Sequence, residues 1–289
     1  MPEKRVIAIT GAAVFLAGHL LESLRKKGAE TVEVDSRTGV DILDFEKLKG
    51  LPPFDTMVHL AARTFVPDSY KDSLGYFSTN VTGTLNCLEL CKLRKADFIF
   101  ASTYVYGKPE RLPVGEDHPL SMWQPYAASK IIGESLCMAY CQNFGINCCI
   151  LRIFNMYGPG QDVRFLIPTI IEGLKSGKLS LKTSTPRRDF VYVLDVVSAI
   201  EKCIGSGFSG TAVYNVGTGE SHSVAEVVGI IKELMKSDAS VSYEEVRREA
   251  EVDDVYSDIS KIKQELGWKP GFDLRAGFRH YLDFIGTRL

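Results

Sequence analysis

The sequence has no excess of positive charge and no long apolar run. Thirty-four Lys and Arg residues are balanced by thirty-six Asp and Glu residues, which gives a formal net charge of −2. No basic field therefore exists to gather nucleic acid or an anionic membrane surface. The apolar runs are too short to span a membrane, and the first ten residues (MPEKRVIAIT) lack the apolar stretch of a secretory signal. We expect a cytoplasmic protein with no nucleic-acid or membrane partner.

The cysteines lack the spacing of a metal site or a disulfide framework. There are seven, an odd number, and without an export signal this favours reduced thiols. Cys87/Cys91 and Cys137/Cys141 have i,i+4 spacing, but no CxxC or His-x-x-x-His motif accompanies them. We expect no metal, and thiols packed as small apolar side chains.

Short strand-like runs alternate with helical patterns over the first half of the chain. The sequence shows no internal repeat or low-complexity tract, and its 289 residues suffice for one large domain or two modest ones. The alternation predicts an α/β fold with a parallel sheet covered on both faces. Strands are predicted over 5–10, 31–34, 54–60, 98–101, 147–154, 188–197 and 213–216, and helices over 19–27, 80–95 and 125–144.

The pattern changes after Tyr157, where Gly158, Pro159 and Gly160 interrupt it. Short helices and strands follow without a repeating unit, and the last predicted strands lead the chain back toward the first unit. We therefore expect one unit of residues 1–156 plus about 189–216, and a smaller one of about 157–188 plus 217–289.

The first strand-to-helix turn (TGAAVFLAGHL) is where an α/β sheet would bind a ligand. Only Gly11 stands where a GxxGxxG fingerprint requires glycine, because Val14 and Ala17 occupy the other two positions. Asp35 ends the second strand, where an acid can accept hydrogen bonds from the adenosine ribose. Its carboxylate repels a 2′-phosphate and favours NAD, although Arg37 two residues on leaves NADP open.

A second signal is YAASK, from Tyr126 to Lys130. On a helix this i,i+4 pair shares one face, so the Lys130 ammonium can stabilise the Tyr126 phenolate and make it a usable base. The preceding strand ends in Ala101, Ser102 and Thr103, and a hydroxyl there could contact the same substrate oxygen.

Taken together, these motifs resemble the extended short-chain dehydrogenase/reductases, specifically the NAD-dependent nucleotide-sugar epimerases and dehydratases. The resemblance covers nearly the whole chain and implies a Rossmann-type doubly wound sheet with a smaller C-terminal substrate domain. The further motifs are VDILD (40–44), VHLAA (58–62), NVTGTLN (80–86), FASTYVYG (100–107), LRIFNMYGPGQ (151–161), RDFVYVLD (188–195), YNVGTG (214–219) and DISKIKQELGW (258–268).

The resemblance also implies a role for each matching residue. Tyr126 would be the general acid/base, Lys130 its electrostatic partner and a ligand of the nicotinamide ribose, and Ser102 or Thr103 the hydroxyl on the sugar oxygen. Nucleotide-sugar binding would involve Asn155, Arg188 and Arg248, since a guanidinium can bond diphosphate oxygens bidentately. Cofactor binding would involve Gly11, Val14, Phe15, Leu16, Asp35, Asp41, Ile42, Leu60, Ala61, Ala62 and Lys130.

Departures from the family pattern narrow the reaction. Thr103 is followed by Tyr104 and Val105, where dehydratases of this family place an acid and the fucose-synthase type places a cysteine. The sequence thus has the motifs needed for hydride transfer but no obvious second acid/base residue. This combination fits C4 epimerisation of a UDP-hexose through a 4-keto intermediate.

Two other functions stay open at this point. A one-way NAD(P)H-dependent 4-ketosugar reductase uses the same parts, and the short Asp35 to Asp44 segment resembles the reductases. Val14 and Ala17 also allow a cofactor-impaired sensor or scaffold, although such a protein has no need of the Tyr126/Lys130 pair. By resemblance, the helices of 80–95 and 125–144 would form a homodimer.

Overall fold

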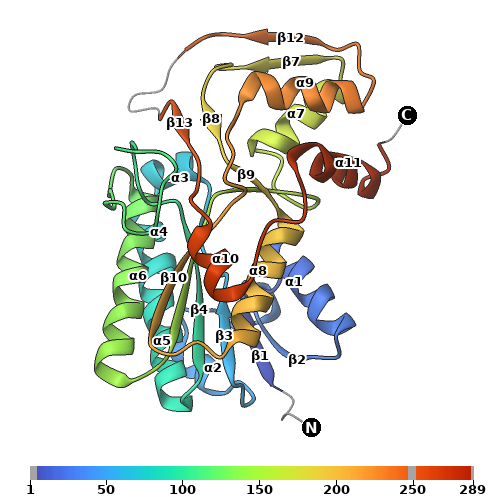
Figure 1. The fold of residues 1–289 in the computed structure, drawn as a ribbon. Coiled ribbons are helices and arrows are strands. Elements are labelled where there is room, and N and C mark those ends of the chain that lie inside the picture. Colours follow the sequence, from blue (N-terminus) through green and yellow to red (C-terminus); the bar gives the residue numbers. More distant parts are fainter. Residues whose placement is uncertain (1–4, 247–251, 288–289) are drawn as a thin grey trace.

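A six-stranded sheet forms the centre of the protein. The computed structural model describes residues 5–246 and 252–287. The strands run parallel in the spatial order β10-β5-β4-β3-β1-β2 (Figure 1). The predicted parallel α/β fold is therefore confirmed. The strands are β1 (Val6–Thr10), β2 (Glu30–Val34), β3 (Thr56–His59), β4 (Asp97–Thr103), β5 (Cys148–Ile153) and β10 (Thr211–Val216).

Helices cover both faces of this sheet. Alternate strand residues point to opposite faces. Ile7 and Ile9 belong to one buried cluster, together with residues of α1 and α8, whereas Ala8 between them belongs to another, with residues of α5 and α6. Figure 1 accordingly shows α1 and α8 on one side of the sheet and α5 and α6 on the other. The helices of the part built on this sheet are α1 (Phe15–Lys26), α2 (Phe45–Lys49), α3 (Val66–Lys71), α4 (Ser73–Phe77), α5 (Gly83–Arg94), α6 (Pro125–Phe144) and α8 (Val193–Ser206).

The order of strands reverses at β1. The chain moves from β1 to β2 on one side and then returns to β3 on the other. Crevices at such a switch point, outside the carboxyl ends of the strands, are where open α/β sheets bind ligands. Gly11 follows β1 there with φ +68°, and a Cβ on it would lie 2.8 Å from the backbone N of Ala61. Only glycine therefore fits at position 11, where the turn after β1 lies against the backbone of Ala61.

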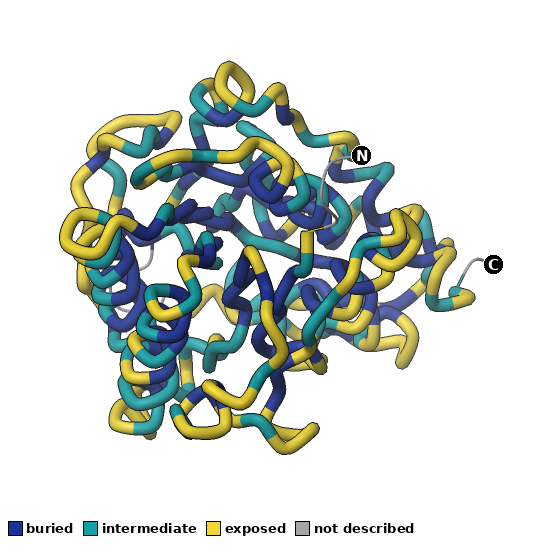
Figure 2. The backbone as a smooth tube through the Cα atoms, turned by 90° about the horizontal axis from the view of Figure 1, so that it is seen from below, coloured by how far each residue is buried: buried dark blue, intermediate teal, exposed yellow. Residues whose placement is uncertain are grey.

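Smaller sheets and further helices form the rest of the described structure, most of it in the upper part of Figure 1. β6 (Asn155–Tyr157) pairs with β9 (Phe190–Tyr192), β7 (Lys178–Leu181) with β12 (Ser240–Tyr243), and β8 (Arg187–Arg188) with both β11 (His222–Ser223) and β13 (Asp254–Val255). The helices are α7 (Leu166–Lys175), α9 (Val224–Leu234), α10 (Ser260–Leu266) and α11 (Leu274–Phe284). Buried segments run through the middle of the molecule in Figure 2, and exposed ones lie mainly at its periphery.

One secondary-structure prediction is wrong over half its length. The run 188–197 was expected to be a strand, but β9 ends at Tyr192 and α8 begins at Val193. The apolar residues Val193, Val196 and Val197 have helical spacing and are buried, and Asp195 in the first turn suits the positive end of the helix dipole. The start of a buried helix and a buried strand can both appear as a short run of apolar residues, so periodicity alone does not distinguish them. This ambiguity explains the error.

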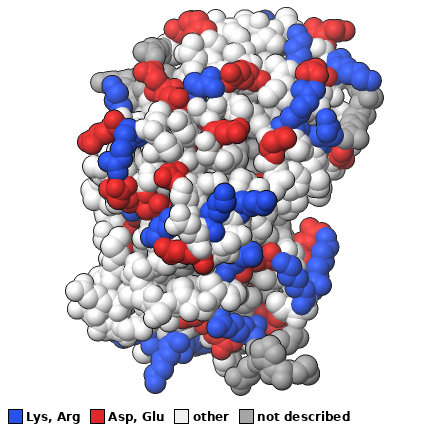
Figure 3. Space-filling model, in the orientation of Figure 1, with Lys and Arg blue, Asp and Glu red and all other residues white. Residues whose placement is uncertain are grey.

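The cysteines are packed as the sequence predicts. All seven cysteines are free, and six of them are buried. On the face shown in Figure 3, acidic and basic side chains alternate without a continuous area of one sign. Among the described residues, no helix is long and apolar enough to cross a membrane.

Candidate active site

At the end of β4, α6 brings Tyr126 beside Thr103 and Lys130 against Ala101. Pro125 occupies the first turn of α6, where proline is well tolerated, so Tyr126 lies at the start of the helix and Lys130 one turn further on. Thr103 is the last residue of β4. The Thr103 hydroxyl lies close enough to the Tyr126 phenol to lower its pKa. One of the two predicted hydroxyls is thus placed at Tyr126.

Ser102, the other predicted hydroxyl, is engaged elsewhere. It is buried, and its Oγ donates a hydrogen bond to Oε1 of Glu134 at 2.5 Å. Thr103, in contrast, is only partly buried. The hydroxyl that the structure places at Tyr126 is therefore that of Thr103.

Lys130 lies against β4 and does not contact the Tyr126 phenol. Its Nζ donates to the carbonyl oxygen of Ala101 at 2.8 Å and lies 4.7 Å from the centre of the Phe100 ring. Burial lowers the pKa of Lys130 to about 8. Burial also raises the pKa of Tyr126 well above its usual value; among the described residues it is Thr103, not Lys130, that partly lowers it. In this arrangement Tyr126 is a protonated phenol.

The turn after β1 offers backbone rather than side chains to a ligand. Val14 is the residue before α1, in an ordinary extended conformation (φ −97°), and its side chain is 39% exposed at the start of that helix. The first turn of α1 contains no acidic residue, so its N–H groups can face an anion. Leu16 is buried in the core, whereas the half-buried Phe15 ring lies against Gly158 and Gly160.

Asp35 is held firmly beside this turn. Its Oδ2 accepts a hydrogen bond from the N–H of Ala13 at 3.0 Å, and its Oδ1 accepts from the backbone N–H and the Nε of Arg37 at 2.9 and 3.1 Å. Burial alone would raise the pKa of Asp35, but the hydrogen bonds from Arg37 and Ala13 outweigh it, so the pKa is lowered. Asp35 is therefore a carboxylate paired with an otherwise exposed guanidinium.

The end of β3 supplies the opposite wall. The N–H groups of Leu60 and Ala61 both donate to the Thr10 hydroxyl at 3.2 Å, and Ala62 follows them, half buried. His59 Nδ1 lies 2.7 Å from the same hydroxyl, and its Nε2 lies 3.0 Å from Thr84 Oγ1. Burial lowers the pKa of His59 to about 3. It is a neutral bridge between β3, β1 and α5.

Asp41 and Ile42 lie further along the same edge. Asp41 is exposed, and its Oδ1 accepts from the N–H of Leu43 at 2.9 Å. Ile42 is buried against Gly83 of α5, and its carbonyl oxygen accepts from Asn86 at 2.9 Å. Asp41 is thus accessible, whereas the Ile42 side chain belongs to the core.

The predicted substrate residues lie on β6 and β8. Asn155 Nδ2 donates to the carbonyl oxygen of Asp189 at 3.3 Å, and Arg188 Nη1 donates to the carbonyl oxygens of Arg187 and Val252 at 2.8 and 2.7 Å. Arg248 lies outside the described residues. Asn155 and Arg188 are therefore near one another through Asp189, but Arg188 is engaged with backbone carbonyls.

Sequence reasoning missed two buried carboxylates. Asp189 accepts hydrogen bonds from the N–H and hydroxyl groups of Thr218 and Ser257 and from the N–H of Gly219, at 2.6–3.1 Å. It thereby fixes the YNVGTG segment beside Asn155. Glu134, described further below, lies two turns after Tyr126 on α6. A charged residue directly before an apolar run was the signal for Asp189, and the continued i,i+4 spacing was the signal for Glu134.

Two observations favour a polar ligand at this site. Oε1 of Gln124, which immediately precedes α6, is buried without a hydrogen-bond partner among the described residues, and so is Oε1 of Gln161. Buried polar atoms are normally hydrogen-bonded. Together with the Gly11 turn and the acid-free start of α1, these residues fit a dinucleotide and a hydroxylated substrate.

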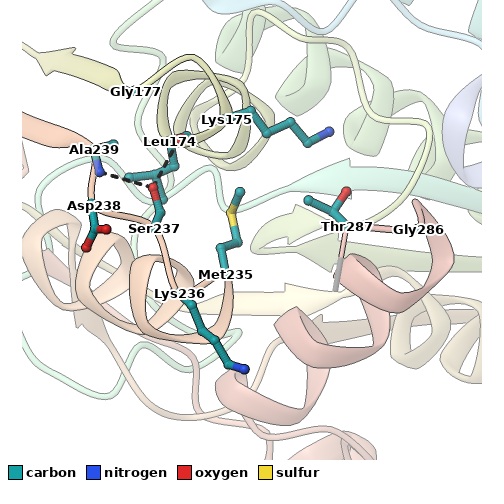
Figure 4. A pocket seen from close by; sticks show the side chains of 10 residues that line it. All are labelled: Leu174, Lys175, Gly177, Met235, Lys236, Ser237, Asp238, Ala239, Gly286 and Thr287. Atoms are coloured by element: carbon teal, nitrogen blue, oxygen red, sulfur yellow. Dashed lines mark hydrogen bonds between the residues drawn. The ribbon is translucent and has the colours of Figure 1, made fainter. Parts of the chain in front are cut away.

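A separate pocket is lined by other residues of the chain than the predicted site residues. It has a volume of about 670 Å³ and lies among the ends of α7, α9 and α11 (Figure 4). None of the predicted site residues in the described part of the chain lines it. Its charged side chains, Lys175, Lys236 and Asp238, form no arrangement suited to hydride or proton transfer.

Comparison with known proteins places this site in a family context. The model of the "NAD dependent epimerase/dehydratase family" matches residues 7–217. The GDP-6-deoxy-D-mannose reductase of Pseudomonas aeruginosa is 30% identical over 97% of this chain and 97% of its own. Among solved structures, the UDP-glucose 4-epimerase of Thermotoga maritima with UDP-glucose has a TM-score of 0.91 at 26% identity and covers 97% of this chain and 98% of its own.

A second solved structure is similar to the same degree. RMD from Pseudomonas aeruginosa, complexed with NADPH, has a TM-score of 0.89 at 28% identity and covers 96% of this chain and 98% of its own. Both NAD and NADPH therefore occur as cofactors among these similar proteins. From the family match over more than half of its length and the end-to-end relatives, the chain belongs to the NAD-dependent epimerase/dehydratase family of extended short-chain dehydrogenase/reductases.

Proposed function

We propose that the protein is an NAD-dependent nucleotide-sugar epimerase that inverts C4 of a UDP-hexose through a 4-keto intermediate. The observation that carries this proposal is the composition of the α6–β4 junction. Tyr126 and Thr103 provide two hydroxyls there, and the next residues, Tyr104 and Val105, provide no carboxylate or thiol. Epimerisation at C4 needs one acid/base at the C4 oxygen, whereas elimination of water needs a second group.

The roles follow from the positions of the side chains. Once its phenol has ionised, Tyr126 takes the proton of the C4 hydroxyl, and the phenol so formed later returns that proton; Thr103 holds the same oxygen and orients it. Lys130 supplies positive charge beneath the reacting atoms and holds the nicotinamide ribose. The chemistry that bound NAD would supply is reversible uptake of the C4 hydride. Asp35 holds the adenosine ribose, and the start of α1 faces the cofactor diphosphate.

The substrate-binding part rests on the neighbouring segments. Asn155 and Arg188 bind the diphosphate of the nucleotide sugar, and Arg248 is proposed as a third contact. The division into a cofactor unit (1–156 plus about 189–216) and a substrate unit (about 157–188 plus 217–289) belongs to the same proposal. The Tyr104 ring is stacked on Phe154, with ring centres 5.5 Å apart, and would lie beside the bound sugar.

A homodimer through α5 and α6 is part of the proposal. Four large apolar side chains on these helices are exposed, and a second copy of the chain would cover them. Light scattering should give twice the monomer mass, and a charged residue at one of these positions should halve it. The side chains are Leu85, Leu93, Met138 and Phe144.

One experiment separates the proposed reaction from its alternatives. The protein is incubated with UDP-glucose and sub-stoichiometric NAD, and UDP-galactose is sought by chromatography. We expect interconversion of the two sugars with no net change in absorbance at the reduced-nicotinamide band. Stoichiometric consumption of NAD(P)H with a nucleotide 4-ketosugar, and no epimerisation, would instead establish the reductase.

The reductase is the second candidate because of specific observations. The Pseudomonas aeruginosa relative is named a reductase, and RMD binds NADPH. Arg37, whose guanidinium lies at Asp35, could also turn toward a 2′-phosphate. If both assays fail and no dinucleotide binds, the protein is a sensor or scaffold.

A further inference from the structure

Three successive turns of α6 contact the last three residues of β4, although not in the same order along the two elements. We call this contact the α6–β4 ladder. Each rung joins a polar side chain of the helix to the strand. The first rung is the proposed reacting pair, and the other two lie progressively deeper in the protein. The rungs are Tyr126 with Thr103, Lys130 with the carbonyl oxygen of Ala101, and Glu134 with Ser102.

The deepest rung is the most strongly bonded. The Glu134 carboxylate accepts from Ser102 Oγ at 2.5 Å and from Nη2 and Nε of Arg152 at 2.7 and 3.1 Å. The side chains of Glu134 and Arg152 are only 1% and 4% exposed. A bidentate carboxylate–guanidinium pair fixes direction as well as distance. Because α6, β4 and β5 each contribute one of these three residues, their relative placement is locked here.

Arg152 extends this lock to the loop beside the cleft. Its Nη1 donates to the carbonyl oxygen of Glu116 at 2.9 Å and to the Tyr106 hydroxyl at 3.1 Å. Tyr106 in turn donates to Oδ1 of Asn215, at the end of β10, at 2.5 Å. The network thus joins three adjacent strands of the sheet to the segment that follows β4.

Glu134 itself cannot touch a substrate. It is fully buried and its carboxylate oxygens are occupied by Ser102 and Arg152. A buried ion pair of this kind adds little net stability, because desolvation costs about as much as the pairing returns. Its presence beneath the reacting pair therefore calls for another explanation.

We propose that Glu134 is a positioning residue: through Ser102 and Arg152 it sets the register of α6 on β4, and with it the placement of Tyr126 beside Thr103 and of Lys130 on the Ala101 carbonyl. This inference rests on the proposed function for the identity of the reacting groups. Displacement of a reacting group by about 1 Å can cost on the order of 10²-fold in rate. A helix held only by apolar contacts would tolerate such a shift.

The same carboxylate supports the charge of Lys130. The titratable groups that face Lys130 are Glu134 and Cys137 on α6 and His59 on β3, while β4 contributes only the Ala101 carbonyl and the Phe100 ring. Burial lowers the pKa of Lys130, whereas Cys137 and, to a smaller extent, Glu134 raise it. His59 is neutral, since its pKa is lowered to about 3. Loss of the Glu134 charge should therefore lower the pKa of Lys130 further.

The test compares Glu134→Gln, Glu134→Asp and Ser102→Ala in the full chain. We expect Glu134→Gln to lower kcat about 10–100-fold with little change in KM, and to move the basic limb of the pH–rate profile to lower pH. Glu134→Asp shortens the side chain, so kcat should fall. Because it keeps the charge, the basic limb of the pH–rate profile should stay in place. Ser102→Ala keeps the ion pair and should fold, with kcat reduced several-fold.

Two controls keep the result specific. Asp195→Asn removes another buried carboxylate, which bonds the N–H groups of Gly271 and Phe272 on the far side of the sheet, and should lower the melting temperature without moving the pH limb. NMR titration of Lys130 in lysine-labelled protein, assigned with Lys130→Arg, measures its pKa without any reaction. That measurement stands even if UDP-hexoses are not the substrate, which the wild-type assay shows separately.

The inference is overturned if Glu134→Gln folds and retains both wild-type kcat and the wild-type pKa of Lys130. If Glu134→Gln does not fold, an unchanged kcat in Ser102→Ala and Glu134→Asp overturns it instead. A pKa shift at Lys130 with reduced kcat supports it.

Discussion

Replacing Gly11 by Ala tests whether the turn after β1 is built around a single close contact. Gly11 has φ +68°, and a Cβ there would lie 2.8 Å from the N and 2.9 Å from the Cα of Ala61. Both atoms belong to backbone, so neither can swing away. Gly28, at the end of α1, has φ +73° but no atom within 4 Å of its would-be Cβ. Gly28→Ala is therefore a matched control.

The two substitutions should differ by the cost of the clash alone. A left-handed conformation costs an L-residue roughly 1–2 kcal/mol, and the reduced entropy of the unfolded chain returns about 0.4–1 kcal/mol. Gly28→Ala should thus destabilise by about 1 kcal/mol. Overpacking at Ala61 adds about 1–3 kcal/mol, so Gly11→Ala should cost about 2–4 kcal/mol in free energy of unfolding.

Urea denaturation followed by circular dichroism measures this difference, with the m-value checking that the unfolding transition stays comparable. Isothermal titration with NAD gives the second measurement, because separating the turn from Ala61 widens the dinucleotide crevice. We expect weaker NAD binding for Gly11→Ala and unchanged binding for Gly28→Ala. Equal losses of stability, with equal NAD affinity, would show that the Gly11–Ala61 contact has no special role.

Four further outcomes are expected. Tyr126→Phe should lower turnover by about 10²–10⁴-fold and leave the fold and NAD affinity intact; more than a tenth of wild-type activity would remove Tyr126 from the mechanism. Val14→Gly should tighten NAD binding in calorimetry, since it removes an exposed side chain at the start of α1, and unchanged affinity would show that the turn already accommodates valine. Arg188→Ala should weaken nucleotide-sugar binding, at a cost of roughly 1.5–3 kcal/mol, without altering NAD binding; equal losses for both ligands would place Arg188 elsewhere. Stability should fall as the pH is lowered from about 6.5 toward about 3, because the unfolded chain protonates His59 in that window whereas burial lowers its folded pKa to about 3; in His59→Gln this part of the pH dependence should disappear.

The sequence predicts elements best where local signals agree with tertiary packing. α6 has its predicted bounds, Pro125 to Phe144, because proline begins it and Gly145, with φ +71°, ends it. α1 begins at Phe15, four residues before the predicted His19, since Val14 has no capping side chain to mark the start. The sequence does not reveal the boundary between β9 and α8. Most residues on both sides of it are apolar and buried, so the change from strand to helix periodicity cannot be seen in the pattern of apolar residues.

The site shows the same limit at the level of single residues. Tyr126 and Lys130 are recognisable because their spacing alone puts them on one face of a helix. Choosing between Ser102 and Thr103 requires the register of α6 on β4, which no local pattern contains. That register is set by Arg152, on a third element, through its contacts with Glu134. The sequence thus predicts that a hydroxyl at the end of β4 takes part in the chemistry. Which hydroxyl it is depends on the Glu134–Arg152 ion pair, whose two residues are brought together only by the packing of α6 on the sheet.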